Sequence, residues 1–252
     1  MSERAKKEYG QHFLVDRNIP DVIGRLADLG PDDVVLEIGP GQGVLTRYLA
    51  ERVRRVHAVE IDRSLEPALT GLGDNVDVVF GDALRLALPR DATKLVANLP
   101  YNVATPIVAE SLDGLPNVRL WCVMVQREVA DRFFAQPGTK AYGAVSVLVQ
   151  LAVERTGFHP VSRTVFRPQP NVDSALVAFR RTELPAEYGR VKELVTAAFA
   201  HRRKTLPNSV VQVGFATREE AAEALAAVGR AGDVRAEALA PAEFVALARA
   251  LQ

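Results

Sequence analysis

The sequence predicts an α/β protein with a doubly wound parallel sheet, followed by a small helical domain. Three observations support this. Short runs rich in Val, Ile and Leu alternate with segments of helical periodicity between residues 34 and 135. Glycine, proline and acidic residues follow the predicted strands, at the edge where such sheets bind ligands. After Leu184-Pro185 the pattern becomes helical only.

The predicted elements alternate as a doubly wound sheet requires. Strands are predicted over residues 34–38, 56–60, 76–80, 95–97 and 119–125, and helices over residues 19–29, 44–52, 65–72, 105–112 and 128–135. Residues 142–159 fit either period, and we favour a helix to about residue 150 followed by a strand. The prolines within residues 166–170 predict an extended loop. Residues 172–180 predict a last strand, which we expect to pair antiparallel.

A domain boundary is predicted near residue 183, where the alternation of strands and helices ends. Residues 1–183 would form the larger domain and residues 184–252 a helical one, with helices over residues 188–200, 218–227 and 241–251. No internal repeat or low-complexity linker interrupts the chain.

Composition is that of an ordinary globular protein. Of the 252 residues, 48% are hydrophobic and 25% are charged. No apolar run is long enough to cross a bilayer, and no secretory segment follows the charged first residues, so we expect the protein in the cytoplasm. The single cysteine, Cys122, lies in an apolar run, which predicts a buried thiol. Of the four histidines, His57, His159 and His201 lack metal-ligand spacing, and we expect no metal site.

Charge is balanced over the chain but not along it. The 31 basic and 31 acidic residues cancel. Between residues 161 and 204, however, nine basic residues stand against four acidic ones, and the segment from residue 215 onward reverses this with six acidic against four basic. A local basic surface suits a polyanion, although an ordinary solvated face would have the same composition.

The stretch Asn98-Leu99-Pro100-Tyr101 follows the fourth predicted strand. Its proline ends the strand, its amide offers one acceptor and two donors, and its phenol ring offers a flat face. Such a corner could hold a planar heterocycle that carries an amino group. It could equally be a structural turn whose Asn satisfies the backbone and whose Tyr covers the core.

A nucleoside site is predicted beside this corner. Gly39, Gly41 and Gly43 follow the first strand and would let the backbone approach a ligand. Glu60 ends the second strand, where a carboxylate can bind ribose hydroxyls, and Asp82 follows the third, where a carboxylate can accept from an adenine amine. The third glycine comes one residue too early for a dinucleotide fingerprint, which disfavours a nicotinamide oxidoreductase. Glu37 before the glycines and Asp82 after the third strand fit S-adenosylmethionine better, because one nucleoside and a zwitterionic amino-acid tail must be held without a pyrophosphate.

With these motifs the sequence resembles the ribosomal RNA adenine dimethyltransferases, and among them the enzymes of the small subunit. The resemblance covers almost the whole chain. It is carried by residues 10–14 (GQHFL), 37–43 (EIGPGQG), 59–62 (VEID), 81–84 (GDAL), 98–101 (NLPY), 125–132 (VQREVADR), 142–147 (YGAVSV), 166–174 (FRPQPNVDS) and 202–206 (RRKTL). It implies a Rossmann-like, class I S-adenosylmethionine-dependent methyltransferase sheet.

The resemblance also implies roles for particular residues. The cofactor pocket would be lined by His12, Leu14, Gly39, Gly41, Glu60, Ile61, Asp82, Ala83 and Asn98. The target adenine would lie between Tyr101 and Phe166, with its amine held at Asn98-Leu99-Pro100. RNA would be bound by Arg163, Arg167, Arg202, Arg203 and Lys204.

The implied reaction is N6-dimethylation of two adjacent adenines of small-subunit (16S) ribosomal RNA. The substrate would be a pre-ribosomal particle and the enzyme a monomer. Two alternatives remain: a macrolide-resistance enzyme acting on large-subunit (23S) RNA, and a non-catalytic ribosome-assembly factor. The chain departs from the family pattern at His12, where many relatives have Asn, at Ser162-Arg163, where a Pro-Pro pair is common, and at Pro207-Asn208-Ser209, where Arg-Asn-Asn is more usual.

Overall fold

The computed structural model describes residues 10–201 and 203–251 and divides the chain into two compact units. The first unit contains the described residues up to Ala130 together with Glu154–Arg181, and the second contains Asp131–Val153 and the residues from Thr182 onward. The change at residues 181–182 lies close to the boundary expected near residue 183. Residues 131–153 group with the C-terminal helices, which their sequence does not indicate.

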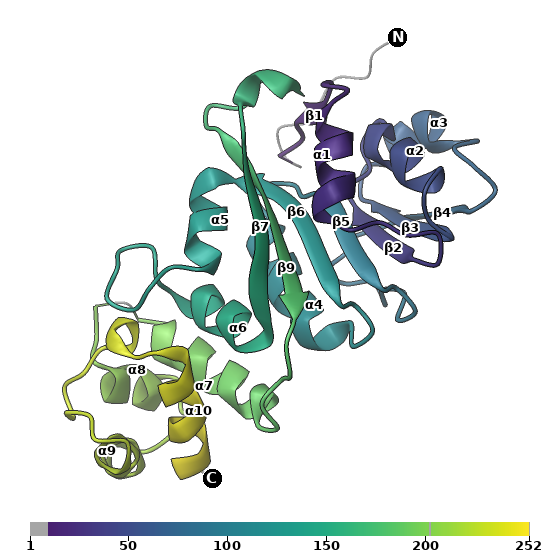
Figure 1. Cartoon of the computed structure of the whole chain (residues 1–252). Helices are drawn as coiled ribbons and strands as arrows, with labels where there is room; N and C mark the ends of the chain where they lie inside the picture. Colours follow the sequence, from purple (N-terminus) through teal and green to yellow (C-terminus); the bar gives the residue numbers. More distant parts are fainter. Residues whose placement is uncertain (1–9, 202, 252) are drawn as a thin grey trace. The chain divides into compact units, whose positions relative to one another are not determined.

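The first unit is built on a seven-stranded sheet of order β4-β3-β2-β5-β6-β9-β7 (Figure 1). The strands are β2 (Val34–Ile38), β3 (Arg55–Glu60), β4 (Val76–Phe80), β5 (Lys94–Asn98), β6 (Leu120–Gln126), β7 (Val153–Val161) and β9 (Ser174–Arg181). Neighbours from β4 to β6 run parallel, whereas β9 pairs antiparallel with β6. The antiparallel pairing expected for the last strand is confirmed.

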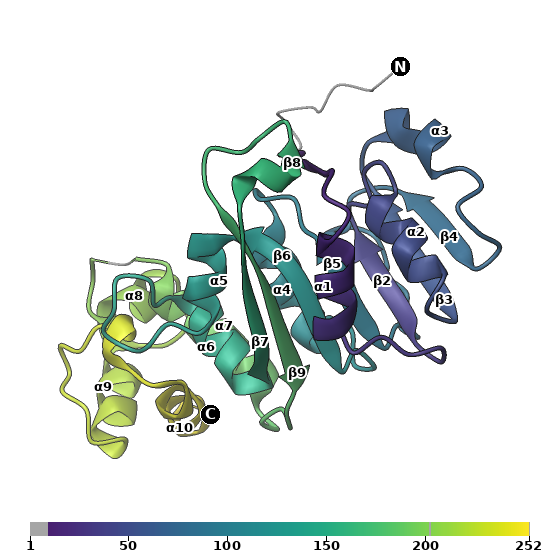
Figure 2. The same cartoon turned by 45° about the horizontal axis from the view of Figure 1, so that its top comes forward.

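Helices cover both faces of this sheet, which explains why its central strands read as apolar runs. Helices α1 (Ile19–Leu26) and α2 (Val44–Ala50) share a core cluster with one face of the sheet. Helix α4 (Ala104–Gly114) packs on the other face, where the Trp121 indole N–H donates to the Ser111 hydroxyl at 2.8 Å. Figure 2 shows α1 and α4 on opposite sides of β5 and β6. The remaining helices are short: α3 (Glu66–Leu69) and α5 (Arg127–Phe133).

A second, two-stranded sheet was not expected from the sequence. Strand β1 (Phe13–Leu14) pairs antiparallel with β8 (Phe166–Arg167), so that Phe13 lies opposite Arg167 and Leu14 opposite Phe166. The Val15 N–H extends the pairing by donating to the Val165 carbonyl at 2.9 Å. This small sheet ties the N-terminal segment to the proline-containing loop between residues 162 and 173.

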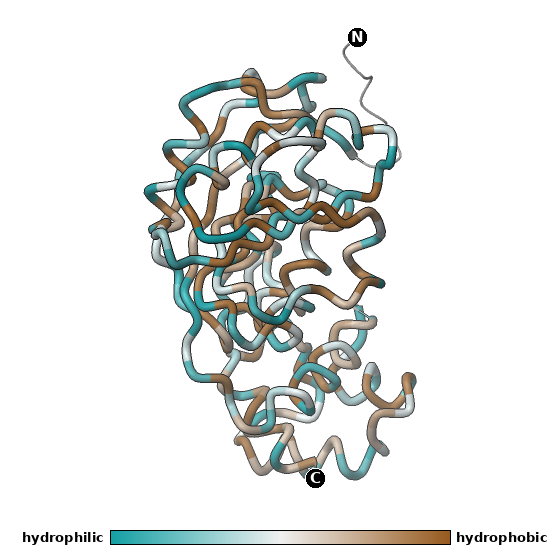
Figure 3. The backbone as a smooth tube through the Cα atoms, turned by 90° about the vertical axis from the view of Figure 1, so that its right-hand side faces the viewer, coloured by the Kyte–Doolittle hydropathy of each residue, from teal (hydrophilic) through white to brown (hydrophobic). Residues whose placement is uncertain are grey.

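The second unit is helical. Its helices are α6 (Ala144–Ala152), α7 (Tyr188–Phe199), α8 (Leu206–Gln212), α9 (Arg218–Ala227) and α10 (Pro241–Ala250). Aromatic side chains pack together in this unit, since the Phe199 ring lies 5.9 Å from that of Phe244 and 6.2 Å from that of Tyr142. Helix α8 was not predicted. In Figure 3 many hydrophobic stretches of the backbone tube run through its interior, while hydrophilic stretches follow many of its outer turns.

Candidate functional site

A turn of left-handed glycines joins β2 to α2. Gly39, Gly41 and Gly43 have φ angles of 76°, 58° and 75°, a region that side chains disfavour. A Cβ at Gly41 would lie 2.9 Å from Phe13 Cδ1, and one at Gly39 would lie 3.3 Å from Pro100 Cδ. The turn therefore passes close to both the N-terminal segment and the corner at Asn98, and only glycine leaves space between them.

Glu60 ends β3 with its carboxylate held by backbone donors. One oxygen accepts from the Gly41 N–H at 3.1 Å and the other from the Asp62 N–H at 2.9 Å. The residue is only 3% exposed, and this burial raises the pKa of its carboxyl group, while the bonded backbone N–H groups oppose the rise. Asp62 in turn accepts from the Gln11 amide at 3.2 Å. Glu60 and Asp62 thus connect the glycine turn to the N-terminal segment.

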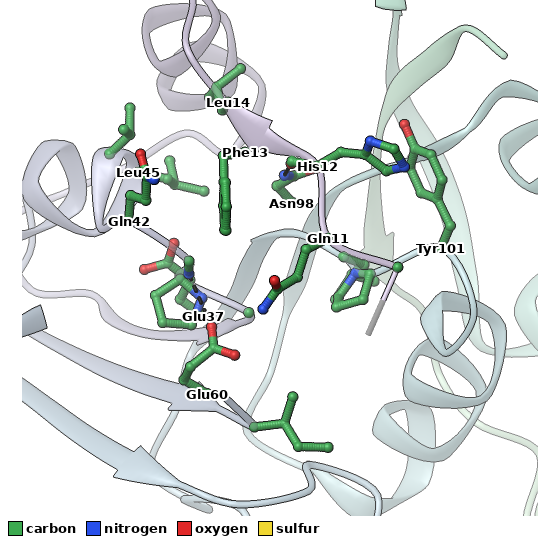
Figure 4. A pocket seen from close by; sticks show the side chains of 18 residues that line it. Gln11, His12, Phe13, Leu14, Glu37, Gln42, Leu45, Glu60, Asn98 and Tyr101 are labelled. Atoms are coloured by element: carbon green, nitrogen blue, oxygen red, sulfur yellow. Dashed lines mark hydrogen bonds between the residues drawn. The ribbon is translucent and has the colours of Figure 1, made fainter. Parts of the chain in front are cut away.

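These residues line a cavity at the carboxyl ends of β2, β3 and β5, with an empty volume of about 680 Å³ including its open mouth (Figure 4). Seven of the nine predicted cofactor residues line it: His12, Leu14, Gly39, Gly41, Glu60, Ile61 and Asn98. The rest of the predicted corner, Leu99-Pro100-Tyr101, lines it as well.

Asp82 and Ala83, the other two predicted cofactor residues, line a neighbouring hollow of about 540 Å³. The two hollows share Gly39, Glu60, Ile61 and Pro100, so they adjoin one another. One Asp82 oxygen accepts from the Leu84 N–H at 2.9 Å, and the other lies 3.5 Å from the Arg85 guanidinium. The structure therefore brings all nine residues to one continuous region around Glu60.

Asn98 ends β5 at the edge of the cavity, and its side chain has a fixed orientation. Its amide N–H donates to the His12 carbonyl at 3.1 Å. In the described part of the chain no hydrogen bond is made to its side-chain oxygen, which remains available as an acceptor. The following backbone is also fixed, because Leu99 N–H donates to the Met124 carbonyl and Val103 N–H to that of Pro100.

Tyr101 follows this corner with its phenol anchored. Its hydroxyl lies 2.6 Å from the Ser174 hydroxyl at the start of β9. Burial is the main cause that raises the pKa of this phenol, with the Asp173 carboxylate adding to it and the Ser174 bond opposing it. The group therefore stays protonated near neutral pH and serves as a ring and a hydrogen-bonding group rather than a base.

Phe166 does not line the cavity. It is 0% exposed and belongs to the core cluster that contains Leu14 and Ile23. Across the small sheet it pairs with Leu14, which belongs to the same core cluster. The predicted stacking of an adenine on this ring stays a prediction, and it requires the ring to leave the core cluster that covers it here.

Glu37 also lines the cavity, although it is not among the nine predicted residues of the cofactor pocket. Its carboxyl group lines the cavity, is 1% exposed and has burial as the main cause of a pKa raised to about 8. Its Oε2 and the Thr46 hydroxyl have no partner of normal hydrogen-bond geometry among the described residues, although that hydroxyl is near enough to oppose the pKa rise. The signal in the sequence was a single acid inside the apolar run at residues 34–38.

The predicted RNA-binding residues fall into both units. Arg163 and Arg167 are exposed in the loop next to β8, where their guanidinium groups donate to the carbonyls of Asn171 and of Thr164 and Phe166. Arg203 and Lys204 are exposed before α8, and the Lys204 ammonium contacts the Gln212 amide oxygen. Arg202 lies outside the described residues. Their role in RNA binding stays a prediction.

Another group of titratable side chains lies outside the cavity lining. His57 lies between Asp77 and Asp91, at 3.3 and 3.2 Å, on the sheet at a distance from the cavity lining. Among residues 10–201 and 203–251, no group of three or more His, Cys, Asp or Glu side chains has a metal-binding arrangement. Cys122 is buried, as its sequence predicted. None of the helices searched in the described chain is long and apolar enough to span a membrane.

Comparison with known sequences identifies the family. Residues 2–252 match the family model "Ribosomal RNA adenine dimethylase". A ribosomal RNA small subunit methyltransferase A of Rubrobacter xylanophilus is 49% identical, over 98% of this chain and 95% of that protein. The protein of the same name in Ligilactobacillus salivarius is 41% identical, over 98% and 90%.

Solved structures agree with this assignment. A dimethyladenosine transferase of Plasmodium falciparum superposes with a TM-score of 0.78 at 26% identity, over 94% of this chain and 96% of that one. The 23S rRNA methyltransferase ErmE superposes with a TM-score of 0.64 at 31% identity, over 95% and 99%. The fold expected from the sequence is therefore confirmed, and the chain belongs to the ribosomal RNA adenine dimethylase family, whose members are S-adenosylmethionine-dependent methyltransferases.

Proposed function

We propose that this protein transfers methyl groups from S-adenosylmethionine to the N6 amines of two adjacent adenines in small-subunit ribosomal RNA. The observation that carries the proposal is the position of Asn98. Its available oxygen lies at the edge of a cavity whose opposite wall carries the buried Glu60 carboxylate (Figure 4). An amine acceptor and a nucleoside-binding acid thus share one site.

The residues of the cavity fit S-adenosylmethionine. Glu60 would accept from the ribose hydroxyls, and Asp82 in the adjoining hollow would accept from the adenine amine of the cofactor. Gly39 and Gly41 line the cavity without side chains, which leaves the backbone of the turn accessible to a ligand. The unpartnered Glu37 oxygen offers an acceptor for a cationic group. The cofactor supplies an electrophilic methyl group on its sulfonium.

Asn98 and the adjacent carbonyls would orient the attacking amine. The Asn98 oxygen accepts one amine hydrogen, which draws the nitrogen lone pair out of conjugation with the ring and toward the methyl group. Of the two nearby carbonyls, that of Pro100 already accepts from Val103 N–H at 3.2 Å. The Leu99 carbonyl is therefore the second acceptor that we favour for the amine.

No protein base is required for this step. The cofactor would supply the methyl group and leave as S-adenosylhomocysteine, and the methylated ammonium formed on the adenine would be acidic enough to lose its proton to water. The protonated Tyr101 phenol fits this chemistry, because its role is to present a ring on which an unstacked adenine can be retained. Repeating the step on the monomethylated amine gives the dimethyl product.

The RNA partner follows from the family and from the exposed basic residues. Relatives of this chain are named small-subunit methyltransferases, and the structurally similar ErmE is named a 23S methyltransferase. We favour the small subunit because the more similar sequences carry that name. Action as a monomer, in the cytoplasm, on a precursor particle is part of the proposal.

Mass mapping of methylated adenines tests the substrate directly. Ribosomal RNA from cells with and without the gene is digested, and the adenines that differ in mass are located. We expect two adjacent dimethylated adenines in small-subunit RNA that disappear with the gene. Loss of a modified adenine from large-subunit RNA instead would support the resistance-type activity, and unchanged methylation of both RNAs would favour a non-catalytic assembly role.

A further inference from the structure

The side chain of His12 is turned away from Glu37 and Glu60 and toward the Tyr101 ring (Figure 4). Its imidazole lies against Tyr101, with 5.1 Å between ring centroids and a tilt of 32° between ring planes. Its Nδ1–H donates to the Pro168 carbonyl at 2.7 Å. The imidazole is thus held between the predicted stacking ring and the loop that carries Phe166.

This arrangement leaves no space for a base on that face of Tyr101. Stacked bases are about 3.4 Å apart, so a base inserted between two rings requires about 7 Å between them. The observed centroid distance is 5.1 Å. Tyr101 cannot simply turn aside, because its hydroxyl is anchored to Ser174 at 2.6 Å. An adenine that uses this face must therefore displace the imidazole.

The second predicted stacking surface is also covered in this structure. Phe166 is 0% exposed, and its strand is paired with the strand that follows His12. The bond from His12 to Pro168 spans the same two segments. The same contacts between residues 12–15 and residues 165–168 therefore accompany both the covering of the Tyr101 ring and the burial of the Phe166 ring.

We propose that the His12 imidazole is a gate for the target adenine: it covers one face of the Tyr101 ring while no base is bound, and it must leave that face before the adenine can stack there. The backbone of His12 has a separate task, since its carbonyl fixes the amide of Asn98 at 3.1 Å. The ring can move by rotation about its side-chain bonds without releasing that carbonyl. His12 is accordingly a positioning residue, and the inference rests on the proposed methylation of a flipped adenine.

Two substitutions distinguish the ring contact with Tyr101 from the hydrogen bond to Pro168. His12→Ala removes both the ring and the hydrogen bond, whereas His12→Phe keeps a ring over Tyr101 but cannot donate to Pro168. Both keep the backbone carbonyl that holds Asn98. His159→Ala is the matched control, because it removes an imidazole from β7 that does not line the cavity.

The measurement is the equilibrium affinity of each full-length variant for unmethylated small-subunit precursor, with S-adenosylhomocysteine present. A ring contact of this kind corresponds to roughly a two- to tenfold change in affinity. We expect His12→Ala to bind precursor two- to tenfold more tightly than His12→Phe, and His159→Ala to match the unaltered protein. Equal or weaker binding by His12→Ala relative to His12→Phe would overturn the gate.

A spectroscopic readout tests the contact itself. The Cε1–H proton resonance of His12, assigned by its loss in His12→Ala, should be displaced by the Tyr101 ring current and return to an ordinary position in Tyr101→Leu. A resonance that does not respond to Tyr101→Leu would refute the covering contact. Methylation of the same precursor by the unaltered protein is scored separately, so failure of the gate is distinguishable from failure of the proposed function.

Discussion

Glu37 is a buried carboxyl group in the lining of the cavity. A carboxyl group that is 1% exposed and lacks a partner for one oxygen is costly to ionise. Burial accordingly raises its pKa from 4.5 to about 8. The group is therefore mainly protonated at pH 7.

A pH-dependent loss of stability follows from this shift. The folded protein holds a proton on Glu37 that the unfolded chain releases near pH 4.5, so the stabilising contribution is complete below that pH and is lost as pH rises toward about 8. In Glu37→Gln this dependence disappears. We expect the stability difference between the two proteins to change by up to about 1.4 kcal/mol per pH unit across this window.

Urea unfolding at several pH values between 5 and 8 measures this difference. The other titrating groups of the site, including Glu60 with its raised pKa, are present in both proteins and largely cancel. Parallel stability curves for the unaltered protein and Glu37→Gln would show that Glu37 does not hold an extra proton when folded.

At the scale of elements, the contact between the glycine turn and strand β1 determines the shape of the cavity. Gly41 and Phe13 approach so closely that a Cβ would lie 2.9 Å from the Phe13 ring. Gly71 has a similar left-handed φ, 71° against 58°, but its Cβ would meet nothing within 4 Å. Substitution of Gly71 therefore reports backbone strain alone, whereas substitution of Gly41 adds the steric contact with Phe13.

Gly41→Ala should weaken S-adenosylmethionine binding by roughly tenfold or more, because the added methyl group displaces Phe13 and distorts the cavity wall. Gly71→Ala should cost about 1 kcal/mol of stability through strain alone and leave the affinity for the cofactor unchanged. Calorimetric titration with the cofactor compares them. Equal affinities in the two variants would show that the contact with Phe13 does not shape the site.

The order of strands and helices in the first unit was predictable because each element there is a periodic apolar run. Strand β1 was not predictable, since two residues carry no period and only the pairing with β8 defines them. Helix α8 was missed because Pro207 and Asn208 interrupt its sequence. Pro207 is nevertheless compatible with a first turn, and Leu206 and Val210 are buried.

The candidate site was predictable to the extent that its residues follow strand ends. Gly39, Glu60 and Asn98 meet because the carboxyl ends of parallel strands share one edge of the sheet. The covering of Tyr101 by His12 and the burial of Phe166 depend on the loop around Pro168, whose path a local pattern does not specify.

At the scale of the whole molecule, a neutral chain is proposed to bind a polyanion through local basic surfaces. Arg203 and Lys204 lie exposed before α8 in the second unit. Arg54 and Arg90 are also exposed but belong to the first unit and line neither hollow. Replacing either pair by Gln changes the net charge equally.

Arg203→Gln with Lys204→Gln should therefore weaken precursor binding and reduce its salt dependence, by about 1.4 to 1.8 in the slope of log K against log salt concentration. Arg54→Gln with Arg90→Gln should have little effect on either quantity. Binding measured between low and moderate salt checks this. If the slope of log K against log salt concentration is equal in the two double variants, Arg203 and Lys204 do not bind the RNA.

The central claim is that Asn98 orients the target amine. Single-turnover methylation of precursor small subunits by Asn98→Ala tests it most directly, with cofactor and precursor affinities measured on the same protein. Asn117→Ala is the control, because its amide also donates to a backbone carbonyl, that of Arg90, but lies outside the cavity. We predict a rate loss of roughly a hundredfold or more for Asn98→Ala with precursor still bound, and an unchanged rate for Asn117→Ala. Methylation by Asn98→Ala at the rate of the unaltered protein would contradict the account.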